Sequence, residues 1–239
     1  MKRNILSGLM VLLAGPLLAA DASPKAEIKS AAAALGSQSN YAWHSAVASP
    51  NGGGRFGGPT DGRTEKGGYT TLSMTRGDNT MQVVLQGTNG AIKTPENGWQ
   101  TLAAAAQDNG EGGFSPVMFL ARTMQNFKAP AVQASDLADQ AKDLQPGTNG
   151  ISGELTEEGA KALLTFRPPG NDGPTITNAR GSVKFWVQDG KLVKYQFQVQ
   201  GHVSFNDNDR DVDRTTTVEI KDVNSTKLEV SDDVKKILK

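Results

Sequence analysis

Apolar and polar residues alternate along the last third of the chain, between residues 181 and 221. Val183, Phe185 and Val187 occupy every second position of one segment, and the next segments continue the alternation. A period of two places successive side chains on opposite faces of a β-strand, so one face is buried and the other is solvated. The pattern predicts three consecutive antiparallel strands, Ser182–Gln188, Lys191–Phe205 and Asp213–Lys221.

The dipeptide Asp189-Gly190 separates the first two of these strands. A type I′ turn needs positive φ at both central positions, and Asp-Gly is one of the pairs that adopt it most readily. The sequence therefore predicts a hairpin at this point. A curved or open antiparallel sheet is the expected scaffold of the chain.

The first half of the chain is typical of one helix followed by a strand meander. Ser23–Leu35 is expected to be helical, because Pro24 suits the first turn and Gly36 ends the apolar spacing. Alternation predicts a strand at Asn40–Ser49, and the glycine-rich segment Pro50–Gly68 is expected to be a loop. Further strands separated by tight turns are expected at Tyr69–Arg76, Asn79–Gly87, Ala91–Thr94 and Trp99–Leu102.

Helical spacing replaces alternation in the middle of the chain. Ser115–Phe127 carries apolar residues three and four positions apart, with Ser115 as a cap and Pro116 in the first turn. Helices inserted between antiparallel strands indicate the α+β class. The other elements expected here are helices at Ser135–Leu144 and Thr156–Leu164, a strand at Ile151–Leu155, a loop at Arg167–Pro174, a strand at Thr226–Val230 and a terminal helix at Ser231–Leu238.

The beginning of the chain has the composition of a secretory signal. A basic start precedes a short apolar run that ends in small residues, which permits cleavage after Ala20 or Ala22. A membrane anchor is the alternative, but the run is shorter than the ~20 residues that span a bilayer, and Pro16 interrupts it. We therefore expect residues 1–22 to be a signal peptide and residues 23–239 to form a single domain, periplasmic or secreted.

Cysteine is absent from the chain, which excludes disulfides, thiolate metal sites and a lipid-modified N-terminal cysteine. The 25 basic and 25 acidic residues balance, and removal of Lys2 and Arg3 leaves 23 against 25, a net charge of −2. No basic patch is interleaved with aromatic residues, so nucleic acid is not an expected partner. No second apolar run follows, so we expect no membrane span after signal cleavage, and a monomer.

Candidate catalytic and metal-binding residues are few. His44 and His202 lie in separate predicted strands, without an evident set of acidic ligands around either. Aspartates alternate from Asp207 to Asp213 and faintly suggest a calcium loop, but Val212 and Val218 stand where an EF-hand needs Gly and Glu. A solvated hairpin end is the other interpretation of these charges. No nucleophile elbow is present, and we expect no enzyme activity, no cofactor and no metal.

Aromatic and methionine side chains cluster in the helical insertion and recur on the predicted strands. Methionine is flexible and adapts to irregular apolar partners, so a helix rich in Met and Phe over a concave sheet could line a hydrophobic cavity. The alternative is that these side chains simply fill the core. The candidate ligand-binding residues are Trp99, Met118, Phe119, Met124, Phe127, Phe185, Tyr195 and Phe197.

The segments Val183–Tyr195, Thr215–Val223 and Lys227–Val230 together resemble the C-terminal part of the LolA/LppX-like lipoprotein-carrier superfamily. In that family a strand, an Asp-Gly turn and a second strand lead to a long strand and a short closing strand. Members that are themselves lipoproteins carry a lipid-modified cysteine, which this chain lacks.

The resemblance implies an unclosed antiparallel half-barrel with helices on its concave face and an apolar cavity for acyl chains. It implies a periplasmic carrier or binding protein for a lipid or acylated (lipoprotein) ligand. The alternative is an exported, non-catalytic structural or interaction module of the same fold, with a filled core.

Overall fold

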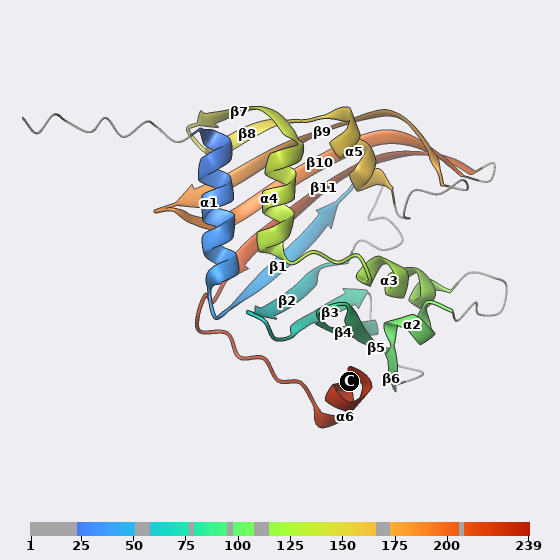
Figure 1. Cartoon of the computed structure of the whole chain (residues 1–239). Coiled ribbons are helices and arrows are strands. Elements are labelled where there is room, and N and C mark those ends of the chain that lie inside the picture. Colours follow the sequence, from blue (N-terminus) through green and yellow to red (C-terminus); the bar gives the residue numbers. More distant parts are fainter. Residues whose placement is uncertain are drawn as a thin grey trace, which may run out of the picture.

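One antiparallel sheet of 11 strands organises the computed structural model (Figure 1), which describes residues 23–50, 58–76, 79–94, 98–107, 115–165, 173–205 and 208–239. The two edge strands do not pair with each other, so the sheet is an unclosed half-barrel, as predicted. Across the sheet the strands are β6 (Gly98–Thr101), β5 (Asn89–Thr94), β4 (Asn79–Gln86), β3 (Thr70–Arg76), β2 (Thr60–Glu65), β1 (Asn40–Ala48), β11 (Asn208–Lys221), β10 (Lys191–Phe205), β9 (Thr175–Gln188), β8 (Gly150–Leu155) and β7 (Ala141–Gly147).

Helices cover the concave face of this sheet in two groups (Figure 1). The first group lies over the half that contains β7 to β11, and the second lies over the half that contains β4 to β6. A short C-terminal helix packs on the opposite, outer face of the second half. The first group is α1 (Pro24–Ser37), α4 (Pro130–Gln140) and α5 (Glu157–Leu164), the second is α2 (Leu102–Ala105) and α3 (Pro116–Met124), and the C-terminal helix is α6 (Asp232–Ile237).

The main core fills the space between the concave face and the first group of helices. Phe185 of β9 and Tyr195 of β10 are fully buried there, and their rings stack with centroids 6.4 Å apart. Ile28 of α1 and Leu137 of α4 close over them at 0% and 1% exposure. The alternation read along these strands is therefore confirmed, because every second side chain enters this core.

Local signals in the sequence account for the ends of several elements. The side chains of Ser23, Ser115 and Thr156 each accept a hydrogen bond from a backbone N–H of the helix that follows. Such caps satisfy N–H groups that have no partner inside the helix. At the predicted hairpin, Asp189 and Gly190 have φ of 51° and 71°, the positive values that a type I′ turn requires.

Two predictions in the first half and the middle of the chain are wrong. The expected loop Pro50–Gly68 contains strand β2, which lies inside the sheet between β1 and β3. The expected helix Ser135–Leu144 is shifted, since α4 begins at Pro130 and ends at Gln140, and β7 follows at once. In both cases pairing with neighbouring strands overrides the local preference of a polar or helix-forming segment.

The segment expected to be a closing strand, Thr226–Val230, is also not a strand. Residues 222–231, which we call the C-terminal strap, cross the outer face of the sheet and lead to α6 (Figure 1). The predicted signal peptide and most of the predicted loop Arg167–Pro174 lie outside the described residues. No helix in the described part of the chain is long and apolar enough to cross a membrane.

Candidate functional site

The concave face around β1 to β5 carries an apolar floor that the sequence did not single out. The indole of Trp43 lies over Gly62 of β2, where a β-carbon would come within 2.0 Å of the ring. Leu72, Val83 and Ile92 continue the floor on the next strands and are 0–4% exposed. Trp43 itself is 5% exposed and donates from Nε1 to Thr64 Oγ1 at 3.4 Å.

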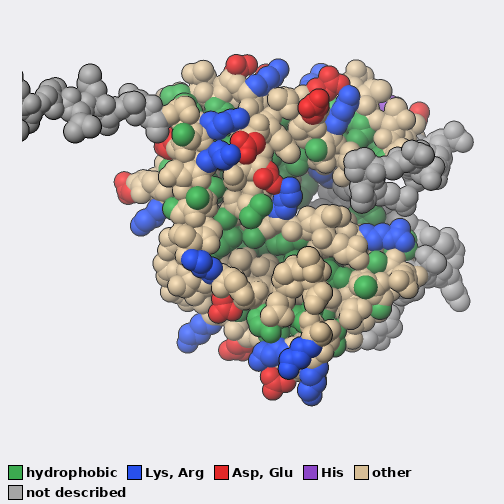
Figure 2. Space-filling model, viewed as in Figure 1, with side chains coloured by type: hydrophobic (Ala, Val, Ile, Leu, Met, Phe, Trp, Pro, Cys, Tyr) green, Lys and Arg blue, Asp and Glu red, His purple; other side chains and the backbone are tan. Residues whose placement is uncertain are grey.

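Phe127 covers this floor from the opposite side. Its ring stacks on Trp43 with centroids 5.9 Å apart and an interplanar angle of 18°. Phe127 lies in the linker that joins α3 to α4, so it marks the division between the two groups of helices. Figure 2 shows hydrophobic side chains gathered in the middle of this face, around the lower end of α4. The floor is therefore roofed here by a linker and not by a helix.

A pair of methionines extends the floor toward its rim. Met74 of β3 and Met81 of β4 are direct partners across the two strands, and both are partly buried against the main core. Their position on the same face as Leu72 and Val83 follows from the period of two. Flexible thioether side chains at this position can adapt to an irregular apolar partner.

Two tyrosines lie beneath α4. The Tyr195 hydroxyl donates to Gln133 Oε1 at 2.6 Å, and burial raises the pKa of Tyr195 well above its usual value. Burial also raises the pKa of Tyr41, against the lowering effect of hydrogen bonds with the Ala131 backbone and Thr64. Both phenols therefore stay neutral at physiological pH and serve as hydrogen-bonding groups that hold α4 on the sheet.

The side chain of Arg214 lies half-buried at the end of the concave face that α5 covers. The Arg214 guanidinium of β11 donates from Nη2 to the Leu163 carbonyl of α5 at 2.5 Å. Burial is the main cause that lowers the pKa of Arg214, and the nearby charge of Arg210 adds to it. The concave face is thus apolar over its centre and carries a positive charge where α5 covers it.

The structure brings together most of the residues that the sequence singled out as ligand-binding candidates. Met118 is buried at 7% exposure in α3, and Phe119 beside it is half-buried. The candidates that pack in or against the main core are Met124, Phe127, Phe185, Tyr195 and Phe197.

Trp99 is placed on the other face, which corrects its expected position in the interior. The register of β4, β5 and β6 aligns Trp99 with Lys93 and Gln82, whose side chains are exposed on the outer face. The indole packs there with Val84 of the sheet and Val234 of α6. A four-residue strand is too short for its own pattern to show which face is buried.

Both histidines lie on the outer face and pair with aspartates. His44 Nδ1 is 2.8 Å from Asp61 Oδ1, and His202 Nδ1 is 2.9 Å from Asp211 Oδ1. Hydrogen bonding to Asp211 raises the pKa of His202, with Asp209 adding a further attraction. Within the described ranges, no cluster of three or more His, Asp or Glu side chains has the geometry of a metal site.

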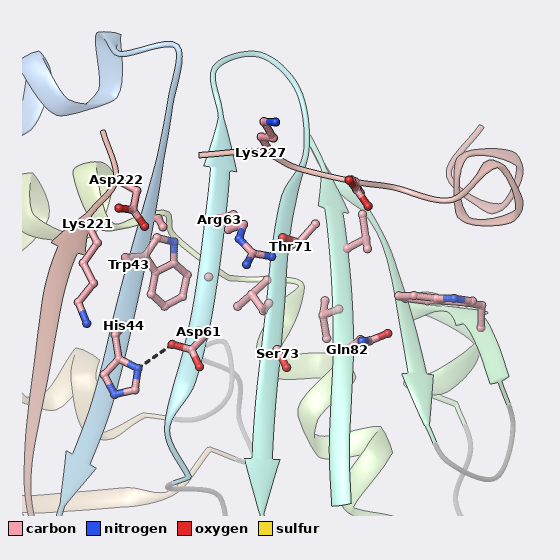
Figure 3. Close-up of a pocket in the computed structure, with 17 residues that line it drawn as sticks. Trp43, His44, Asp61, Arg63, Thr71, Ser73, Gln82, Lys221, Asp222 and Lys227 are labelled. Atoms are coloured by element: carbon pink, nitrogen blue, oxygen red, sulfur yellow. Dashed lines mark hydrogen bonds and ion pairs between the residues drawn. The ribbon is translucent and has the colours of Figure 1, made fainter. Parts of the chain in front are cut away.

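An outer groove of about 760 Å³ lies between the C-terminal strap and the sheet (Figure 3). Its floor consists of outward-facing residues of β1 to β4, among them His44, Asp61 and Arg63. Its roof consists of strap residues, including Lys227 and Glu229. This groove is polar and lies on the face opposite to the apolar floor.

Comparison with solved structures identifies proteins of similar fold. No protein-family model matches the chain, and no curated protein matches its sequence. Among solved structures, the lipoprotein LppX of Mycobacterium tuberculosis is similar over 88% of this chain and 100% of its own, with 12% identity and a TM-score of 0.50.

Two further structures are more distant. LprF of Mycobacterium bovis is similar over 87% of this chain and 96% of its own, with 8% identity and a TM-score of 0.44. A LolA superfamily protein of Nitrosomonas europaea is similar over 90% of this chain and 97% of its own, with 9% identity and a TM-score of 0.33. With its open sheet and helix-covered concave face, the chain has the LolA/LppX-like fold.

Proposed function

We propose that this protein is an exported, periplasmic carrier or binding protein for a lipid or another acylated ligand. The observation that carries the proposal is the apolar floor around Trp43, which is roofed by the aromatic ring of a linker residue, Phe127. An acyl chain that takes the place of this ring would bury apolar surface on both sides, which is favourable by roughly 25 cal/mol per Å².

The packing indicates which half of the concave face would hold the ligand. Under α1 and α4, Phe185, Tyr195 and Leu137 are 0–1% exposed beneath two helices that cover them. The Trp43 floor is also buried, but its cover, the side chain of Phe127, is only partly buried. Over β3 and β4 the side chains of Met74 and Met81 are only partly buried. We therefore place the acyl chain between α4 and α3, along the Trp43 floor, with the methionine pair at its rim.

Of the two helices that border this region, α4 buries mainly small side chains, whereas α3 buries Met118 and Leu120. Around Leu137, α4 buries Ala131, Ala134 and Ala138. Alanine buries little apolar area, so moving such a face costs less free energy than moving one lined by leucine or phenylalanine. A modest movement of α4 would lift the linker and expose Trp43.

Acyl-chain binding is tested by purifying the mature protein from its own envelope for native mass spectrometry and organic extraction. A titration with a dansyl-labelled C11 fatty acid then measures uptake directly. We expect co-purified lipid and saturable binding of the probe. A clean unliganded mass with no uptake would overturn the proposal and favour a filled-core interaction module.

Two matched variants locate the site. Met81→Lys places a charge at the rim of the floor, and we expect it to abolish probe binding while its ammonium reaches solvent and the fold persists. Val132→Lys introduces the same charge on α4 at a side chain that is 52% exposed, and we expect binding to be unchanged. If Met81→Lys and Val132→Lys weaken probe binding equally, the probe does not occupy the Trp43 floor.

A further inference from the structure

The edge strand β6 carries a buried amide nitrogen for which the described residues provide no hydrogen-bond acceptor. This atom is Nε2 of Gln100. A buried N–H group without an acceptor costs free energy comparable to a lost hydrogen bond, so most such groups in folded proteins are paired. The amide of Gln100 therefore calls for a partner from outside the described part of the chain.

The register of the sheet places Gln100 on the concave face. Gln100 is the direct partner of Ile92 across β6 and β5, and Ile92 is 0% exposed in the main core. Residues that are directly opposite each other on antiparallel strands share a face of the sheet. Trp99, the preceding residue, packs on the outer face, as the period of two requires. The buried amide thus belongs to the same face as the Trp43 floor.

Gln100 is at one end of the row of residues that forms this floor. Strand pairing leads from Gln100 through four apolar or glycine positions to Trp43, and these positions are Ile92, Val83, Leu72 and Gly62. From β6 to β1 the row makes five steps between neighbouring strands. At about 4.8 Å per step the path is about 24 Å along the sheet, which is comparable with the length of a long acyl chain. An acyl chain laid along the Trp43 floor would therefore bring its polar end to Gln100.

The surroundings of this amide suit a neutral partner better than a charged one. Helices α2 and α3 lie over this end of the row (Figure 1). The one cation of α3 is Arg122, which is exposed and donates from Nε to the Ala106 carbonyl at 3.1 Å. Thr94, two residues after Ile92 on β5, is 5% exposed and uncharged. A carboxylate that loses its hydration needs a cation as a partner, whereas a neutral carbonyl oxygen needs only a hydrogen-bond donor.

The position of β6 at the edge of the sheet leaves a way out for the rest of the ligand. No described strand pairs with the outer edge of β6. Gln100 as a whole is only half-buried, although its Nε2 is buried. A head group attached to the acyl chain can therefore continue past this edge into solvent while the carbonyl group stays beside the amide.

We propose that Gln100 is a specificity-determining residue of the acyl site, whose Nε2 donates a hydrogen bond to the carbonyl oxygen of a neutral acyl ester. This inference rests on the proposed function, because it requires an acyl chain along the Trp43 floor. It narrows the ligand to an acyl ester, in which a carbonyl group follows the apolar chain directly. The ester oxygen satisfies an amide that is unpaired in the unliganded protein, so this one contact separates esters from lipids that lack the carbonyl group.

The experiment compares two lipids that differ only in this carbonyl group, 1-palmitoylglycerol and its ether analogue 1-O-hexadecylglycerol. Each lipid displaces the dansyl-labelled C11 fatty acid from the mature protein, and the displacement constants are corrected for the affinity of the probe in each variant. We expect the ester to bind about tenfold more tightly than the ether, the effect of one hydrogen bond. In Gln100→Met, which keeps the length of the side chain but has no donor, the affinity for the ester should fall by about tenfold and that for the ether should not change.

Gln82→Met removes an amide from the outer face of β4, where the side chain is exposed, and is the matched control that should keep the preference for the ester. The melting temperature of unliganded Gln100→Met should equal or exceed that of the wild type, because the variant loses an unpaired polar group. A lower melting temperature together with a retained preference for the ester would show that the amide is structural and would overturn the inference.

The wild-type protein alone separates failure of this inference from failure of the proposed function. Equal affinity for the ester and the ether would overturn the role of Gln100 and leave an acyl-chain carrier. Absence of binding of both lipids and of the dansyl probe would overturn the carrier proposal and this inference with it.

Discussion

The indole of Trp43 lies flat across its cross-strand partner Gly62, so closely that a β-carbon on Gly62 would be 2.0 Å from Cε2 of the ring. No other residue fits beneath the indole at this point of the sheet. The contact allows the ring to lie along the floor of the concave face, where Phe127 stacks on its other side. The floor of the proposed acyl site therefore depends on one glycine in a polar strand.

Gly62→Ala is expected to lower the free energy of unfolding by about 1–3 kcal/mol, because the added methyl group forces the indole out of its place. Urea denaturation followed by circular dichroism measures the change. In a Trp43→Ala background, Gly62→Ala should lower the free energy of unfolding much less, because the indole that clashes with the new methyl group is absent. Equal costs in both backgrounds would show that the Trp43 contact is not the cause.

Tyr195→Phe should lower the free energy of unfolding by about 0.5–1.5 kcal/mol, because it removes the hydroxyl that donates to Gln133. A double-mutant cycle with Gln133→Ala measures the coupling between the two side chains. If the losses of unfolding free energy in the two single variants simply add in the double variant, the two side chains are not coupled. That result would contradict a hydrogen bond that holds α4 to the sheet. Hydrogen exchange in α4 should increase in Tyr195→Phe more than exchange in α1.

The pKa of His202 is expected to lie above its ordinary value of 6.5, chiefly because of the hydrogen bond to Asp211. Since the folded protein binds this proton more tightly than the unfolded chain, the stabilisation is fully present below the unfolded pKa. It is lost as pH rises through the folded pKa. The side chain is exposed, so the effect on stability is small and screened by salt.

An NMR titration of the imidazole resonances measures this pKa. Asp211→Asn should move the pKa of His202 back toward its ordinary value. Asp222→Asn, in the strap just beyond the other end of β11, serves as the matched control. A pKa that is unchanged by Asp211→Asn would exclude the hydrogen bond as the cause.

The sequence by itself determined the elements whose signals are local. Side chains that alternate along Val183–Val187 and Tyr195–Val199 need only the period of two to predict a half-buried sheet. Ser23, Ser115 and Thr156 cap the helices that follow them, and Asp189-Gly190 adopts the turn expected of it. Strand alternation, helix caps and the Asp-Gly turn depend on residues that are close in the chain. They can therefore be predicted before any tertiary contact is known.

Only the tertiary structure decided where segments without a strong local signal lie. Strand β2, with sequence TDGRTE, has almost no apolar residues. It is a central strand because β1 and β3 pair with both of its edges and Gly62 accommodates Trp43. The outward position of Trp99 and the course of the strap likewise depend on partners that are distant in sequence. Both the roofed apolar floor and the outer groove arise from such long-range contacts, which no periodicity in the chain encodes.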